Sequence, residues 1–180
     1  TTVSVYGAFY PSPNRSWEMN LSKSTKVNQD YEIKFRDKTL MDGRLEIFLF
    51  PYGFSDGSAR FYGFQSKSST DNETNYADDE YGFTATIGYD ITENLHIQFG
   101  ERIRKVSIGK GAVTSIPFTK DRYTPQEVPG LNGFTAHAQK LAIIYSTLDA
   151  RDMPTRGIYA KASIENSLKA LGSSCDYRHY

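Results

Sequence analysis

The residue types that most often do chemistry are sparse and scattered in this sequence. The three histidines, His96, His137 and His179, are far apart, and no pair has the spacing of two metal ligands on one helix face. No serine stands in the Gly-x-Ser-x-Gly pattern of a hydrolase nucleophile. The single cysteine, Cys175, excludes an intrachain disulfide and a thiolate cluster for a metal. We therefore expect no enzyme activity, no metal site and no cofactor.

One acidic run is the strongest candidate for binding an ion. It consists of Asp71, Glu73, Asp78, Asp79 and Glu80. Carboxylates suit a divalent cation, but the run lacks the residue spacing of a calcium-binding loop. A solvated loop is the favoured interpretation, and we interpret the charged residues around Asp121 and Arg122 in the same way.

Composition narrows the class of protein. The chain has 180 residues, with 21 basic and 21 acidic side chains and no net charge, so it lacks the basic surface of a nucleic-acid binder. It is rich in Tyr (13), Phe (11) and Gly (14), which favours strands and turns. No apolar run is long enough for a transmembrane helix.

The elements that must position any site are strands, because apolar and polar residues alternate. Residues 79 to 90 place Phe83, Ile87 and their neighbours on one face and Thr84, Thr86 and theirs on the other. Thr92 to Asn94 predict a turn into a strand at 95 to 104, and 109 to 132 a long loop. Further strands are expected over Gly133 to Leu148 and 158 to 165.

The first half shows the same pattern less regularly. Strands are expected over 3 to 10, 17 to 22, 31 to 36 and 45 to 49, with turns at 11 to 14 and 37 to 43. Phe48 interrupts the polar set of the fourth strand. Residues 51 to 78 are expected to form a long polar loop, which gives about eight strands in all.

Short turns therefore alternate with long loops, and each strand is apolar on one face. This pattern predicts an antiparallel transmembrane β-barrel. A soluble β-sandwich that binds a ligand has similar strands, but its connections have no reason to segregate by length. In the barrel, Phe83, Ile87, Ile97, Phe99, Ile158 and Ile164 face lipid, and Thr84, Thr86, Gln98, Arg102 and Lys161 face the lumen.

Several motifs resemble the barrel of the Omp85 superfamily, also called bacterial surface antigen D15 or the BamA/TamA family. They are 129 to 133 before a strand, the turn with Tyr145, Asp149, Pro154, Arg156 and Gly157, the stretch 170 to 180, and upstream Arg60, Phe61, Tyr62 and Gly63 with Tyr76, Glu80 and Tyr81. In the turn, Pro154 fixes its φ, Gly157 permits a positive φ, and Asp149 can accept hydrogen bonds.

The resemblance implies that residues 1 to 180 are about eight strands of one larger barrel, roughly 12- to 16-stranded, with no POTRA or soluble domain among them. It implies a bacterial outer-membrane location and a role in assembly, insertion or translocation of proteins. Expected partners are outer-membrane lipid and lipopolysaccharide, client outer-membrane proteins or assembly subunits, and further strands of the precursor. A passive pore or surface antigen and the anchor of a fused patatin-like phospholipase are the alternatives.

Two expectations concern topology. The turns at 92 to 94 and 149 to 157 should lie in the periplasm, and 51 to 78, 109 to 132 and the loop with Cys175 at the cell surface. Because the chain starts within a strand and Tyr177 to Tyr180 begin another, we expect an open sheet that other strands complete.

Overall fold

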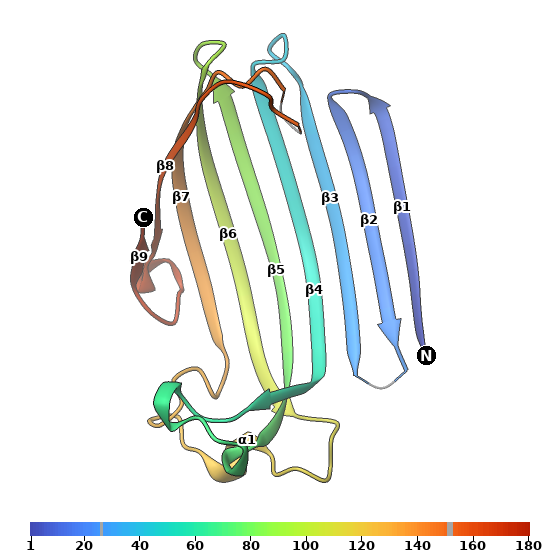
Figure 1. Cartoon of the computed structure of the whole chain (residues 1–180), viewed down its shortest axis with the longest axis vertical. Coiled ribbons are helices and arrows are strands. Elements are labelled where there is room, and N and C mark those ends of the chain that lie inside the picture. Colours follow the sequence, from blue (N-terminus) through green and yellow to red (C-terminus); the bar gives the residue numbers. More distant parts are fainter. Residues whose placement is uncertain (26, 151–152) are drawn as a thin grey trace.

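In the computed structural model, the described residues form one antiparallel sheet whose nine strands follow each other in sequence order (Figure 1). The structure describes residues 1–25, 27–150 and 153–180. The strands are β1 (Thr2–Ser12), β2 (Arg15–Ser24), β3 (Asn28–Leu40), β4 (Leu45–Phe61), β5 (Thr74–Asp90), β6 (Leu95–Lys110), β7 (Phe134–Ser146), β8 (Tyr159–Ser167) and β9 (Tyr177–His179). The helical elements are the short α1 (Thr119–Arg122) and single 3-10 turns at Gln65–Lys67, Thr70–Asn72 and Lys169–Leu171.

Turn residues determine where the strands reverse. Between β3 and β4, Met41, Asp42 and Gly43 all have positive φ, and the Gly43 N–H donates to the Leu40 carbonyl over 3.1 Å. Between β5 and β6, the N–H groups of Asn94 and Leu95 donate to the Thr92 hydroxyl. Local hydrogen bonds of this kind reverse the chain within a few residues.

Most connections segregate by length as predicted, although the β2–β3 connection is short and the β7–β8 connection, residues 147–158, has as many residues as the connection 62–73. The connections β1–β2, β3–β4, β5–β6 and β7–β8 lie at one end of the sheet, called here the turn end (top of Figure 1). The other end, called the loop end, carries residues 62–73, 111–133 and 168–176 together with the short β2–β3 connection. A chain threaded through a membrane from one side has this arrangement.

The predicted loop at 51 to 78 is wrong in its extent. β4 continues to Phe61 and β5 begins at Thr74, so the connection is residues 62–73. The extra strand residues do not alternate regularly, because Phe54 and Phe61 stand among polar residues and glycines, and polar groups join the two strands there, as in the 2.5 Å bond from the Ser55 hydroxyl to Asp79. Strand pairing that extends beyond the apolar band into water needs no alternation, so the pattern gave no signal there.

The apolar core of the described residues is small, which argues against the sandwich: its buried apolar side chains are those of Val106, Leu131, Ala136, Ala138 and Ala142. Among the described residues the largest fully buried side chains are the polar Asn75, Thr74 and Ser167. In contrast, large apolar side chains are about half exposed, such as Ile87 at 52% and Leu141 at 50%. A soluble sandwich would cover that apolar face with a second sheet. The structure therefore has the construction of a membrane sheet.

The sheet is open, as predicted. In the part of the chain that the structure describes, β1 pairs only with β2 and β9 only with β8. The prediction of about eight strands is close, because β9 is the short further strand expected from Tyr177 onward. The edge N–H and C=O groups of β1 and β9 are thus available to further strands.

Candidate functional site: the two faces, the proline turn and the loop end

The pairing register confirms the predicted alternation of the two faces. Ile87 pairs with Phe99, Tyr89 with Ile97, and Leu141 with Ile164, so these side chains share one face, called here the outer face. Thr84 pairs with Arg102 and Ile144 with Lys161 on the opposite, inner face. The outer face also carries Val3, Val5, Phe9, Trp17, Ile33, Phe35, Ile47, Phe83 and Ile143. Ile158 precedes β8 and is exposed.

Ion pairs line the inner face. Lys34 binds Glu32 over 3.1 Å and Arg36 binds Glu46 over 3.3 Å on β3 and β4. Farther along the sheet, Arg104 binds Glu80 over 3.6 Å. Each carboxylate neutralises a cation, so this face is rich in hydrogen-bonding groups without a large net charge.

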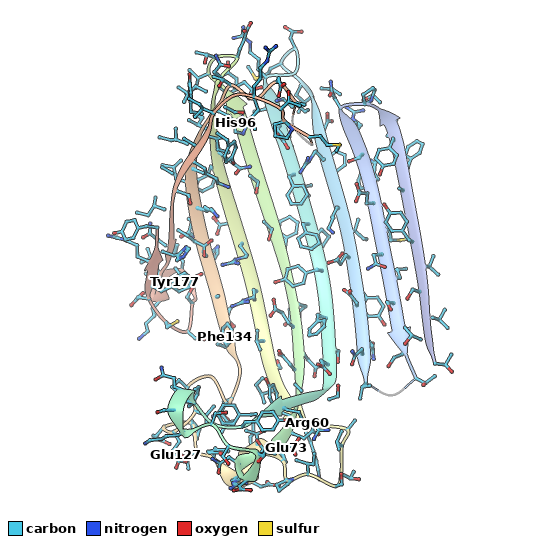
Figure 2. All side chains as sticks on the ribbon, viewed as in Figure 1. Arg60, Glu73, His96, Glu127, Phe134 and Tyr177 are labelled. Carbon is cyan, nitrogen blue, oxygen red and sulfur yellow. The ribbon has the colours of Figure 1, made fainter. Side chains whose placement is uncertain are left out.

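One inner-face cluster joins three strands near the open edge. The Arg102 guanidinium on β6 contacts the Glu165 carboxylate on β8 over 2.7 Å, and the Tyr177 hydroxyl on β9 donates to the same carboxylate over 2.9 Å (Tyr177 is labelled in Figure 2). These bonds hold β9 on the sheet although it has only three residues.

The sequence pattern did not identify a row of aromatic rings on the inner face of β4. Phe48, Phe50 and Tyr52 alternate with the outer-face residues of that strand and pair with Thr86, Thr84 and Gly82 of β5. Phe48 was noticed only as an interruption of the polar set. The available signal was a strand that is apolar on both faces.

A second unpredicted feature lies on the outer face. The Glu101 carboxylate accepts a hydrogen bond from Gln139 over 2.9 Å and contacts the His137 ring. From Leu141 toward the loop end, the outer positions of β7 are therefore polar. On β5, the apolar outer positions continue in the same direction as far as Tyr81. The apolar band is narrower on β7 than on β5.

The predicted proline turn is held by the Asp149 carboxylate. It accepts the Thr155 hydroxyl over 2.5 Å and the backbone N–H groups of Thr155 and Arg156 over 3.0 and 3.3 Å. These bonds, above all the one from the Thr155 hydroxyl, hold the pKa of Asp149 below its ordinary value. The Arg156 side chain is 88% exposed in contrast, and its Nε lies 4.0 Å from the Asp149 carboxylate.

Gly157 closes the same turn. Its φ is +114°, and a Cβ there would collide with the carbonyl group of Thr147. The Thr147 N–H donates to the Ile158 carbonyl over 2.9 Å, which starts the pairing toward β8. Tyr145 lies on the outer face at the end of β7, and residues 151 and 152 of the turn lie outside the described residues. The described residues of the turn therefore have a structural role.

The second predicted motif lies at the loop end. Arg60 and Phe61 end β4, whereas Tyr62 and Gly63 begin the connection, with Gly63 at φ +99°. The Glu73 carboxylate accepts from the Arg60 guanidinium over 3.1 Å and from the Tyr62 hydroxyl over 3.0 Å (Figure 2). The bond to Glu73 also raises the pKa of Tyr62. This motif fastens the loop onto the strand end.

Two long loops are joined to each other at this end. Arg122 donates to the Asp71 carbonyl over 2.8 Å and to the Asn72 side chain over 3.0 Å. Asn75, which is 1% exposed, donates to the Ala59 carbonyl over 2.9 Å and accepts from the Val113 N–H over 3.1 Å. Residues 111–133 therefore form an ordered cap with 62–73, and the interpretation of Arg122 as mere loop charge is wrong.

The acidic run does not form one site. Glu73 accepts a hydrogen bond from Arg60 at the loop end. Asp79 accepts from the Ser55 hydroxyl, and Glu80 accepts from the Tyr52 hydroxyl over 2.5 Å on the inner face. Its assignment to a solvated loop is wrong for Asp78 to Glu80, which belong to β5. Within residues 1–25, 27–150 and 153–180, no group of His, Cys, Asp and Glu side chains is arranged to hold a metal ion.

The histidines are also separate. His96 lies on the inner face near the turn end (Figure 2), where its Nδ1 is 2.6 Å from the Asp90 carboxylate. His137 lies on the outer face. His179 is in β9, opposite Glu165 of β8 in the strand register. None of these three histidines is placed as the base beside a nucleophile. No helix within the described residues has the length and apolar character needed to cross a membrane.

A single sheet with an apolar outer face, a charged inner face and segregated connections defines the wall of a transmembrane β-barrel. The family comparison identifies which barrel: the model of the Omp85 superfamily domain matches residues 14–179, and the chain belongs to this superfamily. Proteins of the superfamily are in general outer-membrane proteins that insert or translocate other proteins. No curated protein matches the chain.

Proposed function

We propose that this chain is part of the barrel wall of a bacterial outer-membrane protein that assembles or translocates other proteins. The observation that carries the proposal is the open sheet of an Omp85 domain, in which no described strand pairs with the outer edge of β1 or of β9. In lipid each unpaired edge group costs several kcal/mol, so further strands of the precursor would complete the wall. The proposed mechanism involves no covalent chemistry, because client strands are recruited through backbone hydrogen bonds.

The proposed orientation places the turn end in the periplasm and the loop end at the cell surface. The tight Asp149–Gly157 turn is small enough to pass through a membrane during insertion, whereas the cap of residues 111–133 is bulky. The outer face then contacts outer-membrane lipid, and the loop end contacts lipopolysaccharide.

The proposal is tested with the complete protein that contains these residues, reconstituted into vesicles. A urea-unfolded client barrel is added to these vesicles and, as a control, to vesicles without the protein. Its folding is followed by the increase in its resistance to protease. We expect faster client folding. Ion conductance without faster folding would indicate the passive pore instead, and hydrolysis of the vesicle lipid would indicate a barrel fused to a phospholipase.

A further inference from the structure

The strand register aligns one line of neighbouring residues across the outer face from β1 to β8. It begins with Phe9 and Trp17, passes through Leu49 and Ala85, and ends with Gln139 and Asn166. This line is called here the Phe9–Asn166 line. Its first residues are apolar and its last ones are polar, although the lipid outside a barrel contacts every strand. The position of the apolar band relative to this line must therefore change across the sheet.

The apolar run of outer-face residues shifts toward the turn end from one side of the sheet to the other. On β1 the run covers outer positions 3 to 9, so Phe9 is its last residue toward the turn end. On β5 it covers positions 81 to 89, and Ala85 is its middle. On β8 and just before it, the run covers positions 158 to 164, so Asn166 lies beyond its loop-end limit. The run is thus displaced along the strands between β1 and β8.

The tight turns shift in the same direction. Counted from the Phe9–Asn166 line toward the turn end, β1 has three more residues and ends at Ser12, and β5 has five more and ends at Asp90. On β7, seven more residues follow, and the strand ends at Ser146. The turns of a transmembrane barrel lie along one membrane border. The turns and the apolar run, which are independent features, therefore give the same diagonal.

The size of the displacement gives the tilt of the strands. The centre of the apolar run lies about three residues to the loop side of the line on β1 and about five residues to the turn side on β8. This drift of about eight residues occurs over the seven strand pairings from β1 to β8. With about 3.3 Å per residue and about 4.8 Å between strands, it corresponds to a tilt of about 40°. Strands of transmembrane barrels tilt by about 35 to 45°.

We propose that the band in contact with lipid crosses this sheet diagonally, so that Phe9 lies near the turn-end border of the bilayer and Asn166 lies among the lipid headgroups of the loop-end border. This inference rests on the proposed barrel wall and adds its orientation in the bilayer. Depth along a tilted strand changes by about 2.5 Å per residue, so Phe9 lies about 8 Å and Asn166 about 12 Å from the middle of a band about 25 Å tall.

The tilt accounts for polar residues on the outer face near the open edge. Arg178 on β9 lies opposite Asn166, and its Nε donates to the Asn166 side chain over 2.7 Å. In strands parallel to the membrane normal, these two residues would lie at the depth of Ala85, among acyl chains, where an arginine is costly. In tilted strands they lie at the border, where the cost is small because water and headgroups solvate the guanidinium. The partner of this part of the outer face is therefore the lipid headgroup layer.

The test measures the depth of nitroxide labels in the complete protein, reconstituted in phosphatidylcholine vesicles. Labels are attached after Phe9→Cys, Ala85→Cys or Asn166→Cys in a Cys175→Ser background, and depth is obtained from the ratio of collisions with oxygen to those with a nickel complex. We expect the Ala85 label near the middle of the bilayer, with the Phe9 label about 8 Å and the Asn166 label about 12 Å from it. A Phe9 label at the depth of the Ala85 label would overturn the inference, because a bilayer thinned only near β8 would give that result.

Ile143 on β7 provides the matched control. It is the middle of the apolar run at 141 to 145, four residues from Gln139 toward the turn end. In the tilted sheet an Ile143→Cys label shares the depth of the Ala85 label, whereas in strands parallel to the membrane normal it would lie about 13 Å away, at the turn-end border. An Ile143 label at that border would overturn the inference. The heat-dependent shift in electrophoretic mobility shows that each variant is folded. The expected depths in a protein that does not fold a client would refute the proposed function and support the diagonal band.

Discussion

Arginine substitutions at three consecutive residues of β6 test the assignment of the two faces. Ile97 and Phe99 lie on the outer face and Gln98 lies between them on the inner face. In a barrel wall, Phe99→Arg inserts a charge among acyl chains, whereas Gln98→Arg places the same charge beside the ion pairs of the lumen. A soluble sheet would give no reason for the costs to alternate in this way.

The depth of each position sets the expected size of the effect. A tilted strand rises about 2.5 Å per residue along the membrane normal. If the turn-end border of the apolar band is at Leu95, Phe99 is four residues further and lies about 10 Å inside a band about 25 Å tall. That is near the midplane, where an arginine costs about 2 to 4 kcal/mol. Ile97 is about 5 Å inside the border, so its arginine can extend to the headgroups and should cost about 1 kcal/mol.

The measurement is reversible urea unfolding of the complete protein in vesicles. Phe99→Arg should lower the free energy of unfolding most, Ile97→Arg less, and Gln98→Arg least. Phe99→Leu is the matched control for loss of the ring. Equal costs at Phe99 and Gln98 would refute the assignment of faces.

Three further outcomes are expected. Since the folded pKa of Asp149 lies below its ordinary value of 3.8, its contribution to stability is present above about pH 4 and is lost as the pH falls through the folded value, so Asp149→Asn should flatten the acid dependence of refolding yield. Gly157→Ala should destabilise the turn by about 1 kcal/mol or more in the same urea assay, because φ is +114° and the Cβ meets the Thr147 carbonyl, and an unchanged midpoint would contradict the turn geometry. Cys175 is exposed at the loop end, so a membrane-impermeant maleimide should label it on whole cells, whereas labelling only after rupture of the outer membrane would reverse the proposed orientation.

The sequence was informative where the membrane requires alternation. Strands β5 to β8 were predicted because lipid on one face and water on the other enforce a period of two, as in Phe83 and Thr84. The pattern ended where strands leave the apolar band, so the pairing of Ser55 with Asp79 was missed. The proline turn was predictable, because Asp149 and Gly157 have local roles.

The remaining features depend on contacts between distant segments. The hydrogen bond from Arg122 to the loop at Asp71 and the contact of Glu101 with His137 join residues far apart in sequence, and no spacing rule connects them. The row of rings on β4 was visible in part, since Phe48 interrupts the polar set. Its position on the inner face became clear only from the strand register, which places Gly82, Thr84 and Thr86 beside it.

The claim that these strands form a barrel wall is tested most directly by spin-label scanning of residues 95 to 104 in the complete protein, reconstituted in vesicles. Collision rates with oxygen, which concentrates in lipid, and with a water-soluble nickel complex are measured at each position. The account predicts opposite alternation with a period of two: oxygen contact at Ile97 and Phe99, and nickel contact at His96, Gln98 and Arg102. Uniform nickel contact at all ten positions would show that this sheet is not in a membrane and would contradict the account.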